Sequence, residues 1–123
     1  MWSLERNTFI LLIFLTLIIM FVITGFIVKA YHAKEKALAE EWYLRGEAEL
    51  KAGRANEAIE DLRTALTYSR DNSLYVLVLA QALGAANRQE EARAYLLSLW
   101  EEEPGNETVN LELGRSAVKQ GRV

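Results

Sequence analysis

The sequence predicts an all-α protein in which an N-terminal transmembrane helix precedes an α-solenoid of about 2.5 helical hairpins. The first observation behind this is a self-similarity: residues 39–72 return, position by position, at 73–106 and again in part at 107–123. The second is an uncharged apolar run over residues 9–28. Repetition with a period near 34 residues is typical of helix pairs that cannot bury their apolar faces alone and must stack on a neighbour.

The apolar run extends from Phe9 to Val28, after a short tail of residues 1–8. At about 1.5 Å per residue this run spans roughly 30 Å, the thickness of the hydrocarbon core of a bilayer. A cleaved signal peptide is the alternative. Its apolar region would be shorter and would end in a small-x-small site, which the segment Gly25-Phe26-Ile27-Val28-Lys29 does not offer. We therefore expect an uncleaved anchor that contacts the lipid bilayer through Phe9 to Val28.

Residues 29–38 are expected to form a helical juxtamembrane connector. Neither Pro nor Gly occurs between Gly25 and Gly46, and most residues in this stretch have high helix propensity. Lys36 and Glu40 can also pair four residues apart on a helix. The sequence therefore predicts one unbroken helix that leads from the apolar run into the first repeat helix and ends near Gly53.

Small residues recur in the repeat domain, residues 39–123, where the two helices of each unit would cross. Gly46, Ala80 and Gly114 hold this position in the first helix, and Ala58 and Ala92 hold it in the second. Two helices can approach closely only where one of them carries Gly or Ala at the crossing. The spacing therefore predicts a close helix crossing in the first two units, and Gly114 holds the same first-helix position in the third.

The ends of the helices are also indicated by residue type. Gly53, Asn87 and Gly121 fall at the turn between the two helices, and Gly and Asn tolerate the left-handed conformation in which helices end. Asn72 and Asn106 precede the second and third units, where their side chains can accept hydrogen bonds from free N–H groups at a helix start.

In these features the chain resembles the tetratricopeptide repeat (TPR) family. The first unit supplies Trp42, Gly46, Gly53, Ala58 and Ala65 at the family's positions, and the second supplies Leu79, Ala80, Ala92 and Pro104. The chain departs from the family's preferences at Arg45, Glu49, Leu62, Arg70 and Leu96, and we expect these departures to weaken the packing of the first unit. The alternative is that two amphipathic hairpins resemble each other by chance.

The resemblance covers residues 39–123 and none of the first 38. The third unit stops at Val123, after the turn and before a second helix. The repeat array is therefore expected to be truncated in its third unit, either as a fragment of a longer repeat protein or with a lone helix as its cap.

The resemblance implies a peptide groove lined by the first helices of successive units. Carried over position by position, the groove residues are Tyr43, Glu47, Leu50, Lys51, Leu77, Gln81, Ala85, Leu111, Arg115, Val118 and Lys119. An apolar row beside a polar row suits an extended peptide, since the first supplies area and the second fixes register. The Lys and Asn set with which the family holds C-terminal carboxylates is absent, and Glu47 would repel a carboxylate. The alternative is that this surface packs on more of the same protein or is merely exposed.

Composition excludes several classes of function. Residues 30–123 carry 12 Lys/Arg against 16 Asp/Glu, a balance of −4, which argues against nucleic acid as a partner. There is no cysteine. The only histidine, His32, lies in the juxtamembrane segment without a second ligand type nearby, and the serines have no histidine to activate them. We expect no catalytic, cofactor-binding or metal-binding residues, and no cofactor.

The function predicted from these features is that of a non-catalytic, membrane-anchored TPR scaffold or adaptor for a protein or peptide partner. Two alternatives remain: the N-terminal part of a larger protein with an enzymatic or assembly module beyond Val123, or a small subunit of a membrane complex. Lys29, Lys34 and Lys36 lie after the span and Arg6 precedes it, which favours repeats on the cytoplasmic side. A short N-terminus with Arg6 is also typical of signal anchors that export the domain after the anchor, and such an anchor would place the repeats in the periplasm.

Overall fold

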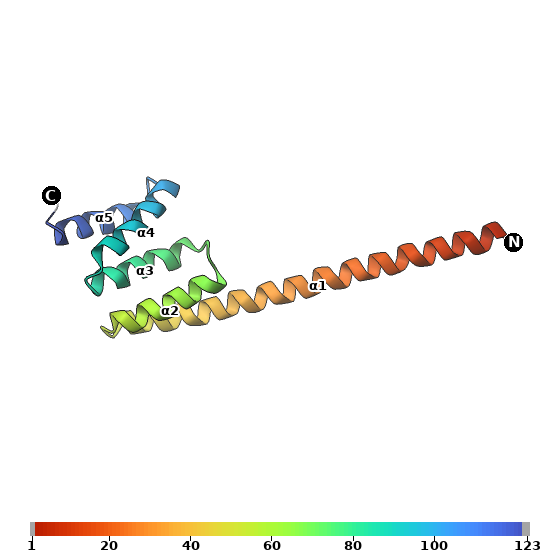
Figure 1. Ribbon diagram of the computed structural model, residues 1–123, viewed down its shortest axis with the longest axis horizontal. Helices are drawn as coiled ribbons and strands as arrows, with labels where there is room; N and C mark the ends of the chain where they lie inside the picture. Colours follow the sequence, from red (N-terminus) through yellow and green to blue (C-terminus); the bar gives the residue numbers. More distant parts are fainter. Residues whose placement is uncertain (1, 122–123) are drawn as a thin grey trace. The chain divides into compact units, whose positions relative to one another are not determined.

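The computed structural model describes the backbone of residues 2–121 and the side chains of residues 3–121. Five helices succeed one another: α1 (Trp2–Lys51), α2 (Ala55–Tyr68), α3 (Ser73–Ala85), α4 (Gln89–Glu102) and α5 (Glu107–Lys119) (Figure 1). The expected all-α class is therefore confirmed for the described residues. The extreme ends of the expected tail and of the third unit, Met1 and residues 122–123, lie outside them.

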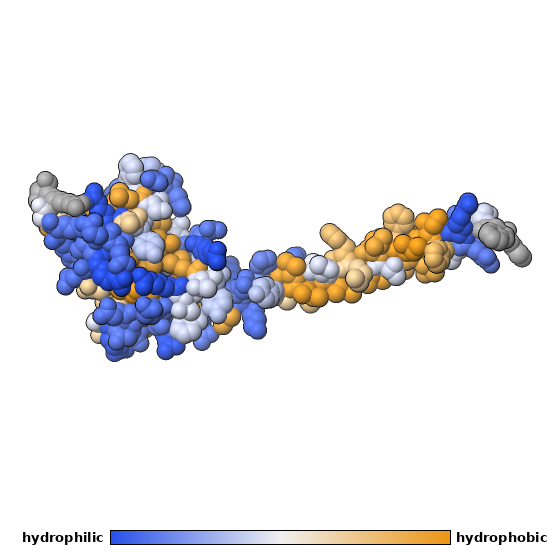
Figure 2. All heavy atoms as spheres, in the orientation of Figure 1, coloured by the Kyte–Doolittle hydropathy of each residue, from blue (hydrophilic) through white to orange (hydrophobic). Residues whose placement is uncertain are grey.

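The chain divides into two compact units, Met1–Lys34 and Glu35–Val123, and α1 contributes residues to both. The expected unbroken helix is confirmed, because α1 is helical throughout and ends at Lys51. In the first unit the apolar side chains are exposed, up to 81% at Phe21. On the visible face of the helix, Figure 2 shows a mostly apolar surface along this segment. By length and composition alone, this is the one helix among the described residues that is suited to cross a membrane.

The second unit repeats with the expected period. α2 begins at Ala55 and α4 at Gln89, while α3 begins at Ser73 and α5 at Glu107, so each pair of helix starts is 34 residues apart. The hairpin turns have the left-handed residues that the sequence predicts. The φ angle is +80° at Gly53, +61° at Asn87 and +70° at Gly121. A residue with a branched side chain at any of these positions would be strained.

Side chains also start two of the helices as expected. The Oδ1 atom of Asn72 accepts a hydrogen bond from the backbone N–H of Tyr75, at 3.2 Å. The Oδ1 atom of Asn106 accepts from the N–H groups of Thr108 and Val109, at 3.1 and 3.2 Å. Each cap satisfies donors that have no partner within the helix and contributes about 1 kcal/mol of helix stability.

The core of the second unit is built on close helix crossings. A Cβ atom placed on Gly46 would lie 2.8 Å from the Cγ atom of Leu62 and 3.3 Å from the carbonyl oxygen of Ala58. Ala58 and Leu62 are completely buried. α1 and α2 therefore meet at a contact in which Leu62 packs against the backbone of Gly46, as the small-residue pattern predicts.

α3 is the central helix of the second unit and packs against α2 and α4. Its buried residues therefore occupy more than one side of the helix; they are Tyr75, Val78, Leu79, Ala80, Ala82 and Leu83. Ala80 and Ala92 are each only 2% exposed, as expected for the crossing of the second hairpin. Because neighbouring helices cover more than one side of α3, its sequence is a nearly continuous run of apolar residues and has no single apolar stripe.

Two departures from the TPR pattern are accommodated at the surface of the first hairpin. The guanidinium of Arg45 lies 5.0 Å from the ring centroid of Trp42 and pairs with Asp61 at 3.5 Å. Glu49 pairs with Arg54, and this hydrogen bond holds the pKa of the Glu49 carboxyl below its usual range. Polar contacts at these two positions replace the apolar contacts that the family's usual residues would make.

The third unit has no close helix crossing at Gly114 within the described residues. A Cβ atom on Gly114 would have no atom within 4 Å, although Gly114 corresponds to Gly46 and Ala80. The reason is that the part of the chain described by the structure places no second helix against this side of α5.

Gly46 and Gly114 allow one substitution to be tested in two environments. Gly46→Ala should lower the free energy of unfolding by roughly 1–3 kcal/mol, because the added methyl group collides with the buried Leu62 side chain. Gly114→Ala should raise it by about 0.5–1 kcal/mol, because the site is open and Ala favours the helix. Urea unfolding of the full chain in a mild detergent measures both. Equal effects of the two changes would show that the repeat register is wrong.

Candidate functional site

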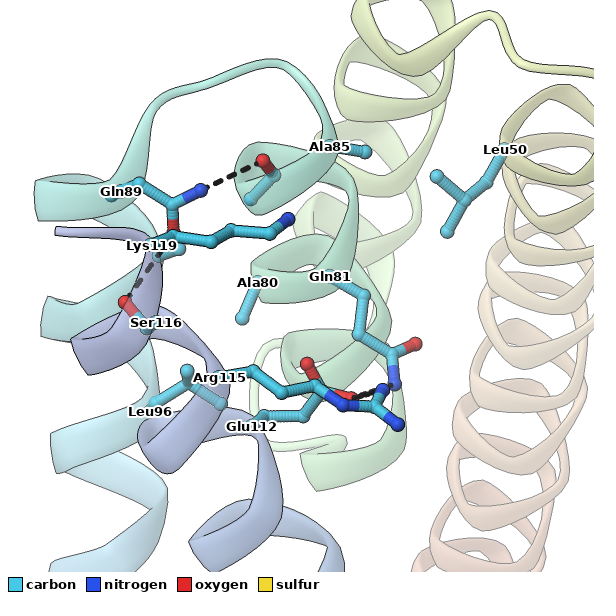
Figure 3. A pocket seen from close by; sticks show the side chains of 12 residues that line it. Leu50, Ala80, Gln81, Ala85, Gln89, Leu96, Glu112, Arg115, Ser116 and Lys119 are labelled. Atoms are coloured by element: carbon cyan, nitrogen blue, oxygen red, sulfur yellow. Dashed lines mark hydrogen bonds and ion pairs between the residues drawn. The ribbon is translucent and has the colours of Figure 1, made fainter. Parts of the chain in front are cut away.

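A cleft of about 280 Å³ opens in the second unit between α3, α4 and α5, with Leu50 from the end of α1 at one side. We call it the α3–α5 cleft (Figure 3). Its lining residues are Leu50, Ala80, Gln81, Gly84, Ala85, Gln89, Ala92, Leu96, Glu112, Arg115, Ser116 and Lys119. All lie between Glu35 and Val123, within one compact unit.

Small residues of α3 create the space in this cleft. Ala80, Gly84 and Ala85 line it from one helix and leave room for side chains from α4. The side chain of Gln89 lies over Gly84, where a Cβ atom would be 3.8 Å from its Oε1 atom. The Nε2 atom of Gln89 donates a hydrogen bond to the carbonyl oxygen of Gly84 at 2.9 Å. A bulkier residue at position 84 would extend into the space that the cleft now leaves open.

Polar side chains link the three helices around the cleft. The hydroxyl of Ser116 on α5 donates to the Oε1 atom of Gln89 on α4 at 3.4 Å, and Ser116 is buried. On the other side, the Nε2 atom of Gln81 donates to Glu112 at 3.3 Å, and Arg115 donates to the same carboxylate oxygen at 3.2 Å (Figure 3). These bonds join α5 to α3 and α4, so the polar wall of the cleft is held in place by several partners.

The charge of the cleft is set by its two cations. Arg115 pairs with Glu112 within the wall. Lys119 has no ion pair within the described part of the chain, and its side chain extends across the cleft (Figure 3). The Nζ atom of Lys119 is therefore the group available to a carboxylate or carbonyl oxygen of a bound segment.

The structure brings together part of the predicted groove. Leu50, Gln81, Ala85, Arg115 and Lys119 line the α3–α5 cleft. The other six predicted residues lie on other surfaces of the second unit. No contact tests whether any of the eleven binds a peptide, so their assignment as a groove stays a prediction.

Leu77 lines a second hollow, between α3 and the turn from α4 to α5, together with the acidic side chains of Glu102 and Glu103. Leu111 and Val118 lie on the outward side of α5, where they are 55% and 68% exposed.

The remaining predicted residues, Tyr43, Glu47 and Lys51, lie on α1. Glu47 and Lys51 pair with each other at 3.6 Å. Tyr43 stacks on Tyr75 of α3, with ring centroids 4.5 Å apart and planes inclined by 14°. Burial raises the pKa of the Tyr43 hydroxyl above its ordinary value, and the nearby carboxylate of Glu47 raises it further. Burial is also the main cause of the raised pKa of Tyr75, with a smaller effect from Glu40. The stacked pair joins the first repeat, residues 39–72, to the second repeat, residues 73–106.

Sequence reasoning missed the residues that the second helix and the far side of α5 supply to the cleft. The expected groove used first-helix positions only, whereas Gln89, Ala92 and Leu96 reach the cleft from α4. Gly84 was the available signal for this cleft, because neither a turn nor a helix crossing requires a glycine at position 84. A glycine on the first helix of a hairpin leaves space that side chains of the second helix can enter. Among the described residues no cluster of three or more His, Asp or Glu side chains could hold a metal ion.

The fold and the cleft define a class of protein, an all-α solenoid of stacked helical hairpins with an exposed cleft. Residues 49–103 match the family model described as Tetratricopeptide repeat. Among solved structures, the chain is similar to the second TPR domain of the human RPAP3 protein, determined by NMR in complex with the HSP70 peptide SGPTIEEVD. The TM-score is 0.61 at 25% sequence identity, over 65% of this chain and 67% of that one. No curated protein matches the chain. These findings support the TPR assignment and an all-helical TPR-like solenoid.

The stacked tyrosines predict a loss of stability in alkali. Because the folded state raises the pKa of Tyr43 and of Tyr75, their contribution is fully present below the ordinary tyrosine pKa of about 10. Above that pH the unfolded chain loses these protons first, so stability should fall. Tyr43→Phe and Tyr75→Phe should reduce the steepness of this fall, and Tyr68→Phe on the surface of α2 is the control. Thermal unfolding between pH 8 and 11 measures it. An identical alkaline slope in all four proteins would contradict this account.

Proposed function

We propose that this protein is a single-pass, membrane-anchored TPR scaffold that holds a protein or peptide partner at the membrane surface and acts by binding and not by catalysis. The observation that carries the proposal is the α3–α5 cleft, with its mixed apolar and polar lining and the amino group of Lys119. The same chain has an exposed apolar helical segment of membrane length.

The exposure of the first unit supports an anchor. None of the most apolar window of α1 is buried within the described residues, as expected for a segment that contacts lipid. Leaving each large aliphatic or aromatic side chain in water costs roughly 1.5–3 kcal/mol relative to burial, and a bilayer removes that cost along the whole run. The Thr8, Thr16 and Thr24 hydroxyls donate to backbone carbonyl oxygens of the same helix, at 2.7–2.8 Å, which satisfies them in an apolar environment.

The cleft supports a partner segment of mixed chemistry. Leu50, Ala85 and Leu96 offer apolar area that fits one aliphatic side chain of a bound segment. Lys119 offers a charged donor at the same opening, which suits an acidic neighbour of that side chain. The RPAP3 domain was determined with an acidic peptide, SGPTIEEVD. The cleft suits an acidic residue within a segment, because the family's residues for a C-terminal carboxylate are absent from this chain.

The excess of lysines directly after the span favours the cytoplasmic side for the repeats, because Lys and Arg are retained there. Lys29, Lys34 and Lys36 lie after the apolar run and Arg6 precedes it. The periplasmic side is the alternative orientation.

The anchor is tested by fractionation. The full chain should remain with membranes after carbonate extraction, because peripheral proteins are released and a spanning helix is not. Leu17→Arg should reduce the inserted fraction, by a local cost of roughly 2.5–3.5 kcal/mol at the centre of the span.

Glu60→Arg, on the exposed side of α2, is the matched control for Leu17→Arg and should leave insertion unchanged. Recovery of the unaltered full chain in the soluble fraction would refute the anchor. Single-cysteine labelling from either side of sealed vesicles reports the orientation, since the chain has no cysteine of its own.

The cleft is tested with a peptide library presented to the full chain in detergent. We expect selected peptides to combine an aliphatic residue with a nearby Asp or Glu. Lys119→Glu should weaken their binding by about tenfold or more, since an attractive ion pair becomes a repulsive one. Ala85→Trp, which fills the cleft, should weaken it as well.

Lys36→Glu and Ala94→Trp are the matched controls, because both positions are exposed and lie outside the cleft. The cleft is not the binding site if selected peptides bind Lys119→Glu and Ala85→Trp as tightly as the unaltered chain. The SGPTIEEVD peptide serves as a reference ligand, for which we expect weaker binding than for the selected peptides.

A further inference from the structure

The second hollow of the repeat domain combines an apolar lining with two carboxylates. It measures about 210 Å³ and lies between α3, the end of α4 and the start of α5. Leu74 is 52% exposed there, so apolar surface remains open to a side chain from another molecule. We call this space the acidic hollow; its apolar and acidic lining residues are Leu74, Leu77, Leu99, Val109, Glu102 and Glu103.

The two carboxylates of the acidic hollow are not neutralised by a cation. Glu103 accepts a hydrogen bond from the side-chain amide of Asn106 at 3.1 Å, and this neutral donor positions the carboxylate without removing its charge. Neither Glu102 nor Glu103 forms an ion pair within the part of the chain that the structure describes. A Lys or Arg side chain suits both features of the hollow, since its methylene groups can lie on the leucines while its charged group reaches the carboxylates.

The acidic hollow and the α3–α5 cleft lie along the same face of α3. Leu74 and Leu77 line the hollow, and Gln81 and Ala85 line the cleft. Successive members of this series are three or four residues apart, which places all of them on one face of a helix. The two spaces therefore follow each other along α3.

The same holds on α5. Val109 lines the hollow, while Glu112, Ser116 and Lys119 line the cleft, again three or four residues apart. Between the two spaces, Gln81 on α3 donates a hydrogen bond to Glu112 on α5 at 3.3 Å (Figure 3). The acidic hollow and the cleft are thus two parts of one groove between α3 and α5, which we call the shared groove.

The two ends of the shared groove carry opposite charges. Glu102 and Glu103 lie at one end, and the amino group of Lys119 lies at the other. Ala85 follows Leu74 by eleven positions, which corresponds to about 16 Å along α3. An extended segment covers that distance with about five residues, at roughly 3.3 Å each.

We propose that the partner segment carries a basic residue about five positions from its acidic residue, and that the acidic hollow binds the basic residue while Lys119 binds the acidic one. This inference rests on the proposed binding of a segment in the α3–α5 cleft, and it names the charge pattern of that segment. The opposite charges also fix the direction in which a given segment lies, because the reversed segment would bring like charges together at both ends.

Synthetic peptides test the charge pattern. The Arg–Asp peptide has blocked termini and about ten residues, with Arg and Asp five positions apart, each beside a Leu in an Ala/Ser background. It is made in both orders, and the tighter-binding order is used with the full chain in mild detergent. Replacing its Arg by Gln should weaken binding about tenfold, as measured by fluorescence anisotropy. Shortening the spacing to two positions should weaken binding similarly, because one peptide then cannot reach both ends.

Two matched substitutions in the last turn of α4 test the hollow itself. Glu102→Lys should weaken binding of the Arg–Asp peptide about tenfold or more, since it places a cation beside the bound Arg. Glu101→Lys makes the same charge change outside the hollow and should alter binding less than about twofold. A peptide with Glu in place of Arg should bind Glu102→Lys more tightly than the unaltered chain, which a loss of folding could not produce.

The effect of Lys119→Glu separates failure of this inference from failure of the cleft. If Lys119→Glu weakens binding but Glu102→Lys behaves like Glu101→Lys, the acidic hollow does not bind the segment and the cleft proposal stands. Equal affinity for the Arg–Asp peptide and its Gln counterpart would overturn the inference in the same way. If Lys119→Glu also has no effect, the cleft is not the binding site and both proposals are refuted.

Discussion

The close crossing of the two helices within a hairpin is the contact on which the rest of the repeat unit depends. Gly46 has no side chain where the buried Leu62 packs against it, and Ala80 and Ala92 take the equivalent places in the second hairpin. Helices that meet this closely do not tolerate larger side chains at the contact. An interior packed to crystal-like density cannot accommodate an added methyl group unless its neighbours move. The hairpins then stack through α3, which is covered on both sides.

The binding surface depends on the same small residues. Ala80, Gly84 and Ala85 have small side chains or none, which leaves space beside α3. The side chain of Gln89 enters this space from α4 and forms hydrogen bonds with Gly84 and Ser116. The cleft is thus not an addition to the scaffold. It lies where α3, α4 and α5 meet, and its one unpaired cation within the described residues, Lys119, lies in the last turn of α5.

Features governed by local chemistry could be predicted from the sequence. The left-handed turns at Gly53 and Asn87 and the cap at Asn106 depend on residues within a few positions, and all of them form as expected. The cleft depends on pairs that are far apart in the chain, such as Gln81 with Glu112, and residue spacing does not determine which rotamers bring such pairs together. The register likewise gives the place of Gly114 on its helix, but not whether another helix covers it.

A saturation substitution scan of residues 39–121, with the abundance of folded full-length protein as its readout, tests the central role of the small-residue crossings most directly. The account predicts a pattern with the repeat period, in which large residues are rejected at Gly46, Ala58, Ala80 and Ala92 and accepted at Gly114. Equal tolerance at all five positions, or rejection that does not match the 34-residue register of the helix starts, would contradict it.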